Sequence, residues 1–184
     1  MRFVFDDRKA AQAAVYLLRR SGGTMKYVKL LKLMYLADRQ AFVETGYPIT
    51  GAKMVSMDKG PVLSEVYSQI TWGDAAETPW SRLIAADADY RVSLRPDVGE
   101  LLYLSEYDED VLGQVFDKFG DLDPWALVRF THTLPEWKDP DGSSLPIDTR
   151  IILEEAGKSS EEIQDIAAQV EAIRAMRLSS VLVG

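Results

Sequence analysis

The stretch KLLKLMYLADRQAF, residues 29–42, decides the fold because it predicts a helix that is buried on nearly all sides. Between residues 30 and 37 only Lys32 is charged, whereas a helix at a protein surface normally has one apolar stripe and one polar face. A helix that is apolar almost all round is usually part of a core. We therefore expect other elements to pack against both of its faces.

Helix start and stop signals define two consecutive helices at the beginning of the chain. Asp6 or Asp7 is expected to cap the first helix, which a Gly-Gly pair ends. Thr24 is expected to cap the central helix, which runs to about Thr45 and stops at Gly46. The first helix is then in a position to cover one face of the central helix.

The next part of the chain predicts a short strand, a third helix and a hairpin. The strand is expected over residues 52–57, and Pro61 is expected in the first turn of the third helix, where its missing N–H costs no hydrogen bond. This helix would cover the other face of the central helix. Residues 72–89 are expected to form a loop, and the apolar runs that flank residues 95–99 are expected to pair as a hairpin.

Four further helices are predicted after the hairpin from their caps and from the spacing of their apolar residues. Their predicted limits are Asp108 to Gly120, Asp123 and Pro124 to about Thr133, Asp148 to Gly157, and a capping box of Ser159 with Glu162 that opens an amphipathic helix. The whole pattern predicts a mainly α chain of the α+β class, a compact helical domain with a small antiparallel sheet or hairpin. We expect a domain over residues 1–140 and a helical extension over residues 141–184, packed on it or appended to it.

The composition is that of an ordinary globular protein. The chain has 184 residues, of which 47% are hydrophobic and 27% charged, and this length suits one domain with a buried core. It has no run of about 18 apolar residues, the length that predicts a membrane span. The lack of cysteine excludes disulfides, thiolate metal sites and a cysteine nucleophile, and it fits a reducing compartment. We therefore expect the protein in the cytoplasm.

Charge is distributed unevenly along the chain. Residues 1–60 contain 11 Lys and Arg against 5 Asp and Glu, a balance of +6, whereas residues 61–184 contain 10 against 24, a balance of −14. The net charge of −8 repels DNA phosphates at long range, and only the first third of the chain has a basic balance. Either the two parts complement each other within one fold, or the basic part meets an acidic partner.

Three motifs, in order along the chain, resemble those of the SocA-like antitoxin family, whose domain is named Panacea. They are a K-L-x-K-L-x-Y-L-A helix, a G-x-P turn followed by a G-P-V-x-x-x-V-Y stretch, and a T-H-x-x-P-W segment. The matching residues are Lys29, Leu30, Lys32, Leu33, Tyr35, Leu36, Ala37, Gly46, Pro48, Gly60, Pro61, Val62, Val66, Tyr67, Thr131, His132, Pro135 and Trp137. Glu136 stands between the last proline and tryptophan and departs from the family pattern. The likeness covers roughly residues 8–140.

This resemblance implies an antitoxin, a small bacterial or phage protein of the cytosol that neutralises a protein toxin encoded by an adjacent gene. Such antitoxins are not enzymes, so the resemblance implies no catalytic residue, no cofactor and no metal. The partner would be the toxin, and a homodimer stays open; nucleic acid and membranes are not expected as partners. The candidate toxin contacts are Lys29, Lys32, Tyr35, Tyr67, His132 and Trp137, and Gly60 with Pro61 form a structural motif.

Several of these residues also have a purely structural interpretation. Lys29 and Lys32 lie three apart on one helical stripe, either as solvated lysines whose stems cover apolar neighbours or as one side of an interface with an acidic surface. His132, late in a short helix, meets the negative end of the helix dipole, or it belongs to the toxin interface. Gly60 and Pro61 form a tight entry to a helix, or an anion site at its start.

Other functional classes have weaker support in the sequence. It lacks HExxH, GxSxG, GxGxxG and Walker-type motifs, and its single histidine would have to serve any histidine-based mechanism alone. Residues 108–133 have the outline of a helix-turn-helix DNA-binding regulator, but nine acidic residues lie between 97 and 123. The apolar tail LSSVLVG, residues 178–184, suits an adaptor that delivers the toxin to a protease, or it is a frayed terminus.

Overall fold

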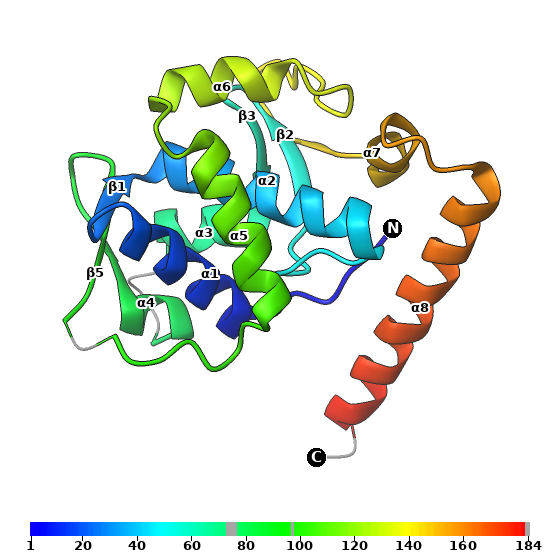
Figure 1. Ribbon diagram of the computed structural model, residues 1–184, viewed down its shortest axis with the longest axis horizontal. Coiled ribbons are helices and arrows are strands. Elements are labelled where there is room, and N and C mark those ends of the chain that lie inside the picture. Colours follow the sequence, from blue (N-terminus) through cyan, green and yellow to red (C-terminus); the bar gives the residue numbers. More distant parts are fainter. Residues whose placement is uncertain (73–76, 97, 183–184) are drawn as a thin grey trace.

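The fold is mainly helical, with eight helices and six short strands among the residues that the computed structural model describes, 1–72, 77–96 and 98–182 (Figure 1). In chain order the elements are α1 (Asp7–Arg20), β1 (Thr24–Lys26), α2 (Tyr27–Thr45), β2 (Met54–Met57), β3 (Gly60–Leu63), α3 (Ser64–Trp72), α4 (Pro79–Leu83), β4 (Ile84–Ala86), β5 (Arg91–Leu94), α5 (Glu106–Phe119), α6 (Pro124–His132), β6 (Leu145–Pro146), α7 (Thr149–Glu155) and α8 (Ser160–Leu182). The predicted α+β class is confirmed.

Helix α2 is the centre of the molecule, as its sequence predicts (Figure 1). Residues 30–38 of this helix are all buried, because α1, α5, α6 and strand β3 pack around it. The largest buried side chains include Tyr35, Phe42 and Leu33, all from α2. An apolar helix of this kind is stable only when it is covered, at roughly 1.5–3 kcal/mol for each large side chain that is fully buried.

Two small antiparallel sheets flank this helical core instead of the one that the sequence predicts. One has the strand order β1-β5-β4, and the other has the order β3-β2-β6. In the first sheet Met25 lies opposite Val92, and in the second Val55 lies opposite Val62. All four side chains are buried, so each sheet presents an apolar position to the core.

Thr24 does not cap the central helix, so this prediction is wrong. Thr24 lies in β1 opposite Ser93, and its hydroxyl donates to the carbonyl of Val92 over 3.1 Å. The residue before α2 is Lys26, which makes no side-chain cap. Instead the N–H of Tyr27 donates to the carbonyl of Tyr90. A backbone acceptor from the β4–β5 turn thus replaces the expected side-chain cap.

Pro61 does not begin a helix, and this prediction is wrong as well. Pro61 lies in β3 opposite Ser56, and α3 begins only at Ser64. Strand β3 is an edge strand of its sheet, where a proline that lacks an N–H removes no hydrogen bond from the ladder. A strand, and not a helix, therefore covers α2 at Pro61.

The predictions between residues 72 and 108 were right in part. The expected loop contains α4 and β4. The predicted hairpin across residues 95–99 is wrong, because β5 pairs with β4 and β1, and residues 100–104 form no strand. Residues 73–76 of the predicted loop and Asp97 of the predicted turn lie outside the described residues. Helix α5 is capped by Ser105, not opened by Asp108, because the two residues exchange hydrogen bonds in a capping box.

The other predicted helix ends are confirmed. Asp6, Asp123 and Asp148 each accept a hydrogen bond from a backbone N–H in the first turn of a helix. Gly46 ends α2 in the left-handed conformation. The predicted capping box before α8 is formed, since Ser159 N–H donates to the carboxylate of Glu162 and Glu162 N–H donates to the hydroxyl of Ser159.

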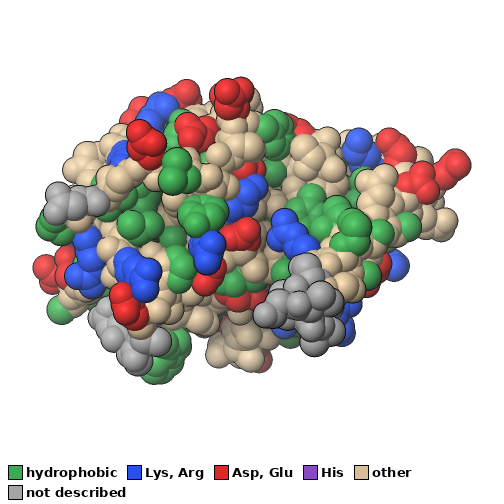
Figure 2. Space-filling view, turned by 90° about the horizontal axis from the view of Figure 1, so that it is seen from below, with side chains coloured by type: hydrophobic (Ala, Val, Ile, Leu, Met, Phe, Trp, Pro, Cys, Tyr) green, Lys and Arg blue, Asp and Glu red, His purple; other side chains and the backbone are tan. Residues whose placement is uncertain are grey.

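Residues after 140 join the rest of the fold through a strand and a long helix. Strand β6 pairs with β2, and Ile147, Ile152 and Leu153 belong to the hydrophobic core. Helix α8 runs along one side of the molecule (Figure 1), and its Ile166 would lie 3.3 Å from a Cβ atom at Gly46. Figure 2 shows the face seen from below, on which acidic, basic and hydrophobic side chains are interspersed. The division of the chain at residue 140 stays a prediction.

Among the described residues, no helix combines the length and the apolar character that crossing a membrane requires. The side chains at the end of α8 and residues 183–184, which include most of the apolar tail, lie outside the described part of the chain.

Candidate functional site

Lys26, which directly precedes α2, and Lys29 and Lys32 within α2 each donate a hydrogen bond to a backbone carbonyl from a different segment. Lys26 Nζ donates to Asp89 O over 2.5 Å, Lys29 Nζ donates to Gly120 O, and Lys32 Nζ donates to Pro61 O over 2.7 Å. These bonds connect α2 to the β4–β5 turn, to the C-terminal end of α5 and to β3. Gly120 is also where the negative end of the α5 dipole favours a cation.

Lys32 lies where three predicted motifs meet. Its side chain is 1% exposed, and burial lowers its pKa to about 7. Gly60 has a φ of +89° and approaches closely, since a Cβ atom there would lie 2.7 Å from Thr131 Oγ1, 3.0 Å from Lys32 Nζ and 3.1 Å from His132 Cδ2. Glycine is therefore required at this position both for its backbone angle and for space.

His132 and Trp137 form a stacked pair beside this junction. Their ring centroids are 4.0 Å apart and the ring planes differ by 13°, and Trp137 Nε1 donates to Met57 O over 3.1 Å. His132 Nε2 is buried and has no hydrogen-bond partner among the described residues. Burial and the nearby charge of Lys32 lower the pKa of His132, and a hydrogen bond with the Asp58 backbone opposes this shift. His132 therefore favours the neutral form.

Glu136, the residue that departs from the family pattern, is buried and fully engaged. Its Oε1 accepts from Tyr35 Oη and from Arg39 Nε, each over 2.7 Å, and its Oε2 accepts from Arg39 Nη2 over 3.3 Å. Burial and the neighbouring carboxylate raise the pKa of Tyr35 well above its usual value. The pair of Arg39 and Glu136 holds the segment after α6 against α2.

The structure brings most of the candidate toxin contacts together, but it leaves few of them exposed. Lys32 and Tyr35 are buried, and Tyr67, His132 and Trp137 are half-buried. Lys29 lies apart from this cluster, on Gly120. As the protein stands, the first two side chains are not on a surface that a partner meets directly.

Two adjoining hollows open beside this junction, and we call them together the aromatic groove. The smaller, the lysine hollow, has a volume of about 220 Å³ and is lined by Lys32, Gly60 and Tyr67 among others. The larger, the outer hollow, has a volume of about 550 Å³ and is lined by Tyr90 and Trp125 among others. The two hollows share Tyr27, Val28 and Lys59.

The outer hollow carries exposed aromatic side chains and two lysines. Trp125 is 57% exposed and Tyr90 is 68% exposed. Lys59 Nζ lies 5.7 Å from the centroid of the Trp125 ring, and the Tyr27 and Tyr90 rings are 6.0 Å apart. Tyr90 has a φ of +59°, a backbone angle that is rare for a bulky residue and often marks a constrained or functional position.

Sequence reasoning missed Tyr90, Trp125 and Lys59 as parts of a site. One signal for Trp125 was present, because Leu127 and Thr131 lie on the buried stripe of α6 and a residue two positions before Leu127 points the opposite way. No local signal places Tyr90 beside Tyr27, since their separation along the chain is closed only by pairing of β1 with β5.

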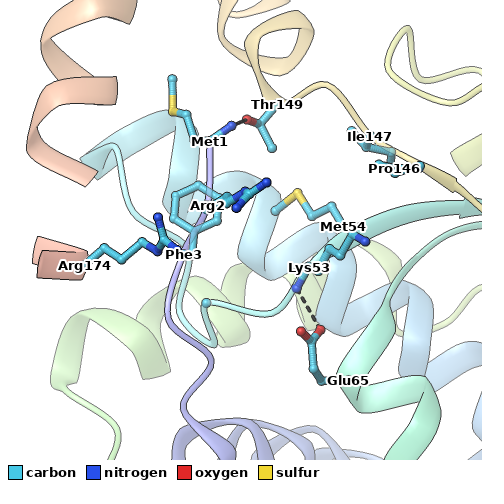
Figure 3. A pocket seen from close by; sticks show the side chains of 11 residues that line it. Met1, Arg2, Phe3, Lys53, Met54, Glu65, Pro146, Ile147, Thr149 and Arg174 are labelled. Atoms are coloured by element: carbon cyan, nitrogen blue, oxygen red, sulfur yellow. Dashed lines mark hydrogen bonds between the residues drawn. The ribbon is translucent and has the colours of Figure 1, made fainter. Parts of the chain in front are cut away.

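A third hollow, of about 490 Å³, lies between the N-terminal segment, β2, β6 and α8 (Figure 3). Its lining includes Arg2, Lys53 and Arg174, with Glu65 as the acidic residue. Figure 3 shows Arg174 extending from α8 toward Phe3, and the backbone N–H of Lys53 donates to the Glu65 carboxylate over 2.8 Å. Its lining is mixed in charge and has no cluster of exposed aromatic side chains, unlike the aromatic groove.

The described part of the chain contains no group of three or more His, Asp or Glu side chains placed to hold a metal ion.

Comparison with known proteins gives one result that bears on function. The model of the family described as antitoxin SocA-like, Panacea domain, matches residues 30–138, which is more than half of the chain. Comparison with curated proteins gives no match, and comparison with solved structures gives none. The matched region includes the junction at Lys32, Gly60 and His132 together with most of the aromatic groove. The chain therefore belongs to the SocA-like antitoxin family with a Panacea domain.

Proposed function

We propose that this protein neutralises a protein toxin, encoded by an adjacent gene, by binding it directly through the aromatic groove. The observation that carries the proposal is the exposure of Trp125 and Tyr90 around the outer hollow. Large aromatic residues are enriched at the centres of protein interfaces, where a few of them supply most of the binding energy. Two such rings exposed together beside a hollow favour an interaction surface, whereas a single exposed hydrophobic residue is ordinary.

Two lysines, Lys26 just before α2 and the motif residue Lys32 within it, support this surface from behind. Lys26 fixes the β4–β5 turn that carries Tyr90, and Lys32 fixes β3 at the base of the groove. Their hydrogen bonds keep Tyr27 and Tyr90 close before a partner arrives, and preorganisation of this kind lowers the entropy cost of binding. The role of the family motifs is thus to position the groove, while Tyr67 lines it.

The proposed mechanism is occlusion of the toxin and involves no reaction on this chain. Cytoplasmic action is part of the proposal, since the toxin is made in the same cell. The helix-turn-helix alternative has less support, because Leu127, Val128 and Thr131 of α6 face the core and Arg129 is the helix's one cationic side chain apart from His132. The adaptor alternative depends on a tail that lies outside the described residues.

The test is co-expression of the chain with the product of the adjacent gene, scored by growth rescue and by co-elution. Trp125→Ala is expected to weaken the complex by about 30-fold or more, the cost of losing an interface hot spot, and to reduce rescue. Trp72→Ala is a matched control, since Trp72 is 78% exposed but lies outside the groove. A complex that tolerates Trp125→Ala combined with Tyr90→Ala would show that the toxin binds elsewhere.

A further inference from the structure

The lysine hollow contains a buried lysine, Lys32, whose ammonium group takes no direct part in docking a partner on the exposed aromatic rings. The buried side chain of Lys32 belongs to its lining, together with Tyr27 and Tyr67. The hollow measures about 220 Å³, and a water molecule occupies about 30 Å³ in the liquid. There is therefore room for a side chain of several heavy atoms beside a buried lysine.

The ammonium group of Lys32 has unused hydrogen-bonding capacity. It donates to Pro61 O over 2.7 Å, which is its one hydrogen bond to the described residues, although an ammonium group carries three N–H donors. None of the ion pairs within the described part of the chain includes it. A buried ammonium group without an anionic partner is costly, so an entering anion would meet both a free charge and free donors.

We propose that the lysine hollow is a carboxylate-binding site, in which Lys32 pairs with an aspartate or glutamate side chain that the toxin inserts beside Tyr27 and Tyr67. This inference rests on the proposed function for the identity of the partner, but the site itself belongs to this chain alone. The tyrosine hydroxyls are further hydrogen-bond donors. The exposed Lys59, at the boundary of the two hollows, adds a second positive charge near the entrance.

A singly charged carboxylate fits this site better than a phosphate. One buried ammonium group balances one negative charge, and a second charge would stay buried without a partner. Asp58 also lines the lysine hollow, and its own carboxylate, which accepts from the Gly142 N–H over 3.1 Å, repels a doubly charged ligand more strongly.

The proposed pairing has a consequence for protonation. Burial lowers the pKa of Lys32 to about 7, and a bound carboxylate is expected to raise that pKa because it favours the charged form. The other ionisable groups around this lysine are His132 from α6, Asp58 and Lys59 from the β2–β3 turn, and the hydroxyls of Tyr27 and Tyr67. Binding is expected to weaken as the pH rises from about 6.5 to about 8.5, because the lysine loses its proton.

The test uses the intact chain and a small probe, 3-phenylpropionate, with the neutral 3-phenylpropionamide as its matched control. NMR titration is expected to give a dissociation constant on the order of millimolar for the carboxylate, the range of a fragment of this size. Binding of the amide is expected to be weaker by about tenfold or more, because it makes no charge-assisted hydrogen bond.

Two lysine variants separate this site from general electrostatics. Lys32→Met is expected to weaken binding of the carboxylate by about tenfold or more, whereas Lys29→Met is expected to bind it as the wild type does, since Lys29 binds Gly120 outside the hollow. If Lys32→Met fails to fold, the pKa of Lys32 is measured in the wild type with and without the probe, and this comparison tests the site. That pKa is expected to rise by about one unit or more when the probe saturates the site.

The proposal of a carboxylate site would be overturned by any of four results. These are equal binding of the two probes, undiminished binding of the carboxylate by Lys32→Met, preferential binding of inorganic phosphate, and no binding of either probe. Failure of the docking proposal is a separate result. A chain that binds 3-phenylpropionate through Lys32, but whose Trp125→Ala variant still captures the toxin fully, retains the carboxylate site and loses the groove as the toxin surface.

Discussion

Single buried residues in and beside the family motifs hold distant segments of this protein together. Lys32 binds β3, His132 stacks on Trp137, and Glu136 accepts hydrogen bonds from Tyr35 and from an arginine of α2. A change at any of them alters the fold and the groove at once. Tests of toxin binding therefore belong on the exposed aromatic rings, and the Lys32 variant that tests the carboxylate site needs a stability measurement beside it.

At Lys32 the pKa shift predicts how stability depends on pH. Burial disfavours the charged form and places the pKa of Lys32 in the folded protein at about 7, below the usual lysine value of 10.5. The cost of burying the charge is therefore full below pH 7, and it decreases as the pH rises from about 7 toward 10.5. We expect the free energy of unfolding to rise between about pH 7 and pH 9 by at most about 1.4 kcal/mol per pH unit. Urea unfolding at several pH values measures this rise.

Lys32→Met is the control for this prediction, because it removes the titrating group. Its free energy of unfolding is expected to be flatter over the same range, and a curve parallel to that of the wild type would assign the pH dependence to another group. Burial raises the pKa of Asp38 to about 7. The effect of Asp38 on the free energy of unfolding therefore has the opposite dependence on pH. Its contribution is lost as the pH rises through 7, so the comparison is made above that value.

At the scale of elements, α8 is a long helix that is attached to the rest of the protein through few buried side chains. Ile163 and Val170 are its buried hydrophobic residues among those described, and Ile166 packs partly buried against the core at Gly46. Ala167, Ile173 and Arg174 are half-buried, and the other described side chains of α8 are exposed. Few buried apolar contacts give an element a low free energy of local opening, so α8 is expected to open transiently under native conditions at a lower free energy than global unfolding.

Val170→Asp is expected to release α8, because it places a charge at a position that is 1% exposed. Amide hydrogen exchange in α8 should become faster by about tenfold or more, while exchange in α2 should stay slow. Met176→Asp introduces the same charge in the same helix at a residue that is 65% exposed. It should change amide exchange neither in α8 nor in α2. Faster exchange throughout the chain after Val170→Asp would mean that α8 is part of the cooperative core.

At the scale of the whole molecule, the basic beginning of the chain and its acidic remainder are joined in one structure. Lys9 pairs with Asp108 over 2.7 Å, and Arg20 pairs with Asp117. The buried pair of Arg39 with Glu136 makes a third connection. The charge asymmetry is therefore explained in large part by contacts within the protein, and nucleic acid is not needed to account for it.

A single cooperative unfolding transition is expected for the intact chain, although the sequence suggests a boundary near residue 140. Strand β6 pairs with β2, and Ile152 and Leu153 of α7 are fully buried in the common core. Tryptophan fluorescence and far-ultraviolet circular dichroism should then give coincident urea transitions, which is the test of two-state behaviour. Two separated transitions would mean that the segment after residue 140 unfolds on its own.

The helices could be predicted from the sequence because their signals are local. An aspartate or serine cap, an apolar spacing of three and four, and a glycine stop lie within one short stretch, and Asp6, Gly46 and Ser159 show all these cases. Strands β1 and β3 could not be predicted in this way. Thr24 pairs with Ser93 and Pro61 pairs with Ser56, so their conformation depends on partners that local propensity does not see.

The candidate site could be predicted only in outline. The motifs at Lys32, Gly60 and His132 do meet in space, but they meet inside the protein. The exposed rings of Tyr90 and Trp125 come from a turn and from the start of a helix, and the local sequence of neither segment indicates a binding site. They form a groove only because the β4–β5 hairpin and α6 reach the same end of α2. Tertiary packing decides which residues are available to a partner.

Lys26 and Lys29 donate to carbonyl oxygens, not to carboxylates, and this has a consequence for the molecule's electric field. Neither ammonium group forms an ion pair within the described part of the chain, whereas the net charge of the whole chain is −8. Two such positive charges, close together in a negatively charged protein, contribute to its dipole moment. For the proposed toxin, we expect these charges to attract an acidic surface before the two molecules touch. The start of α2 is then expected to influence the orientation of the encounter as well as the shape of the groove.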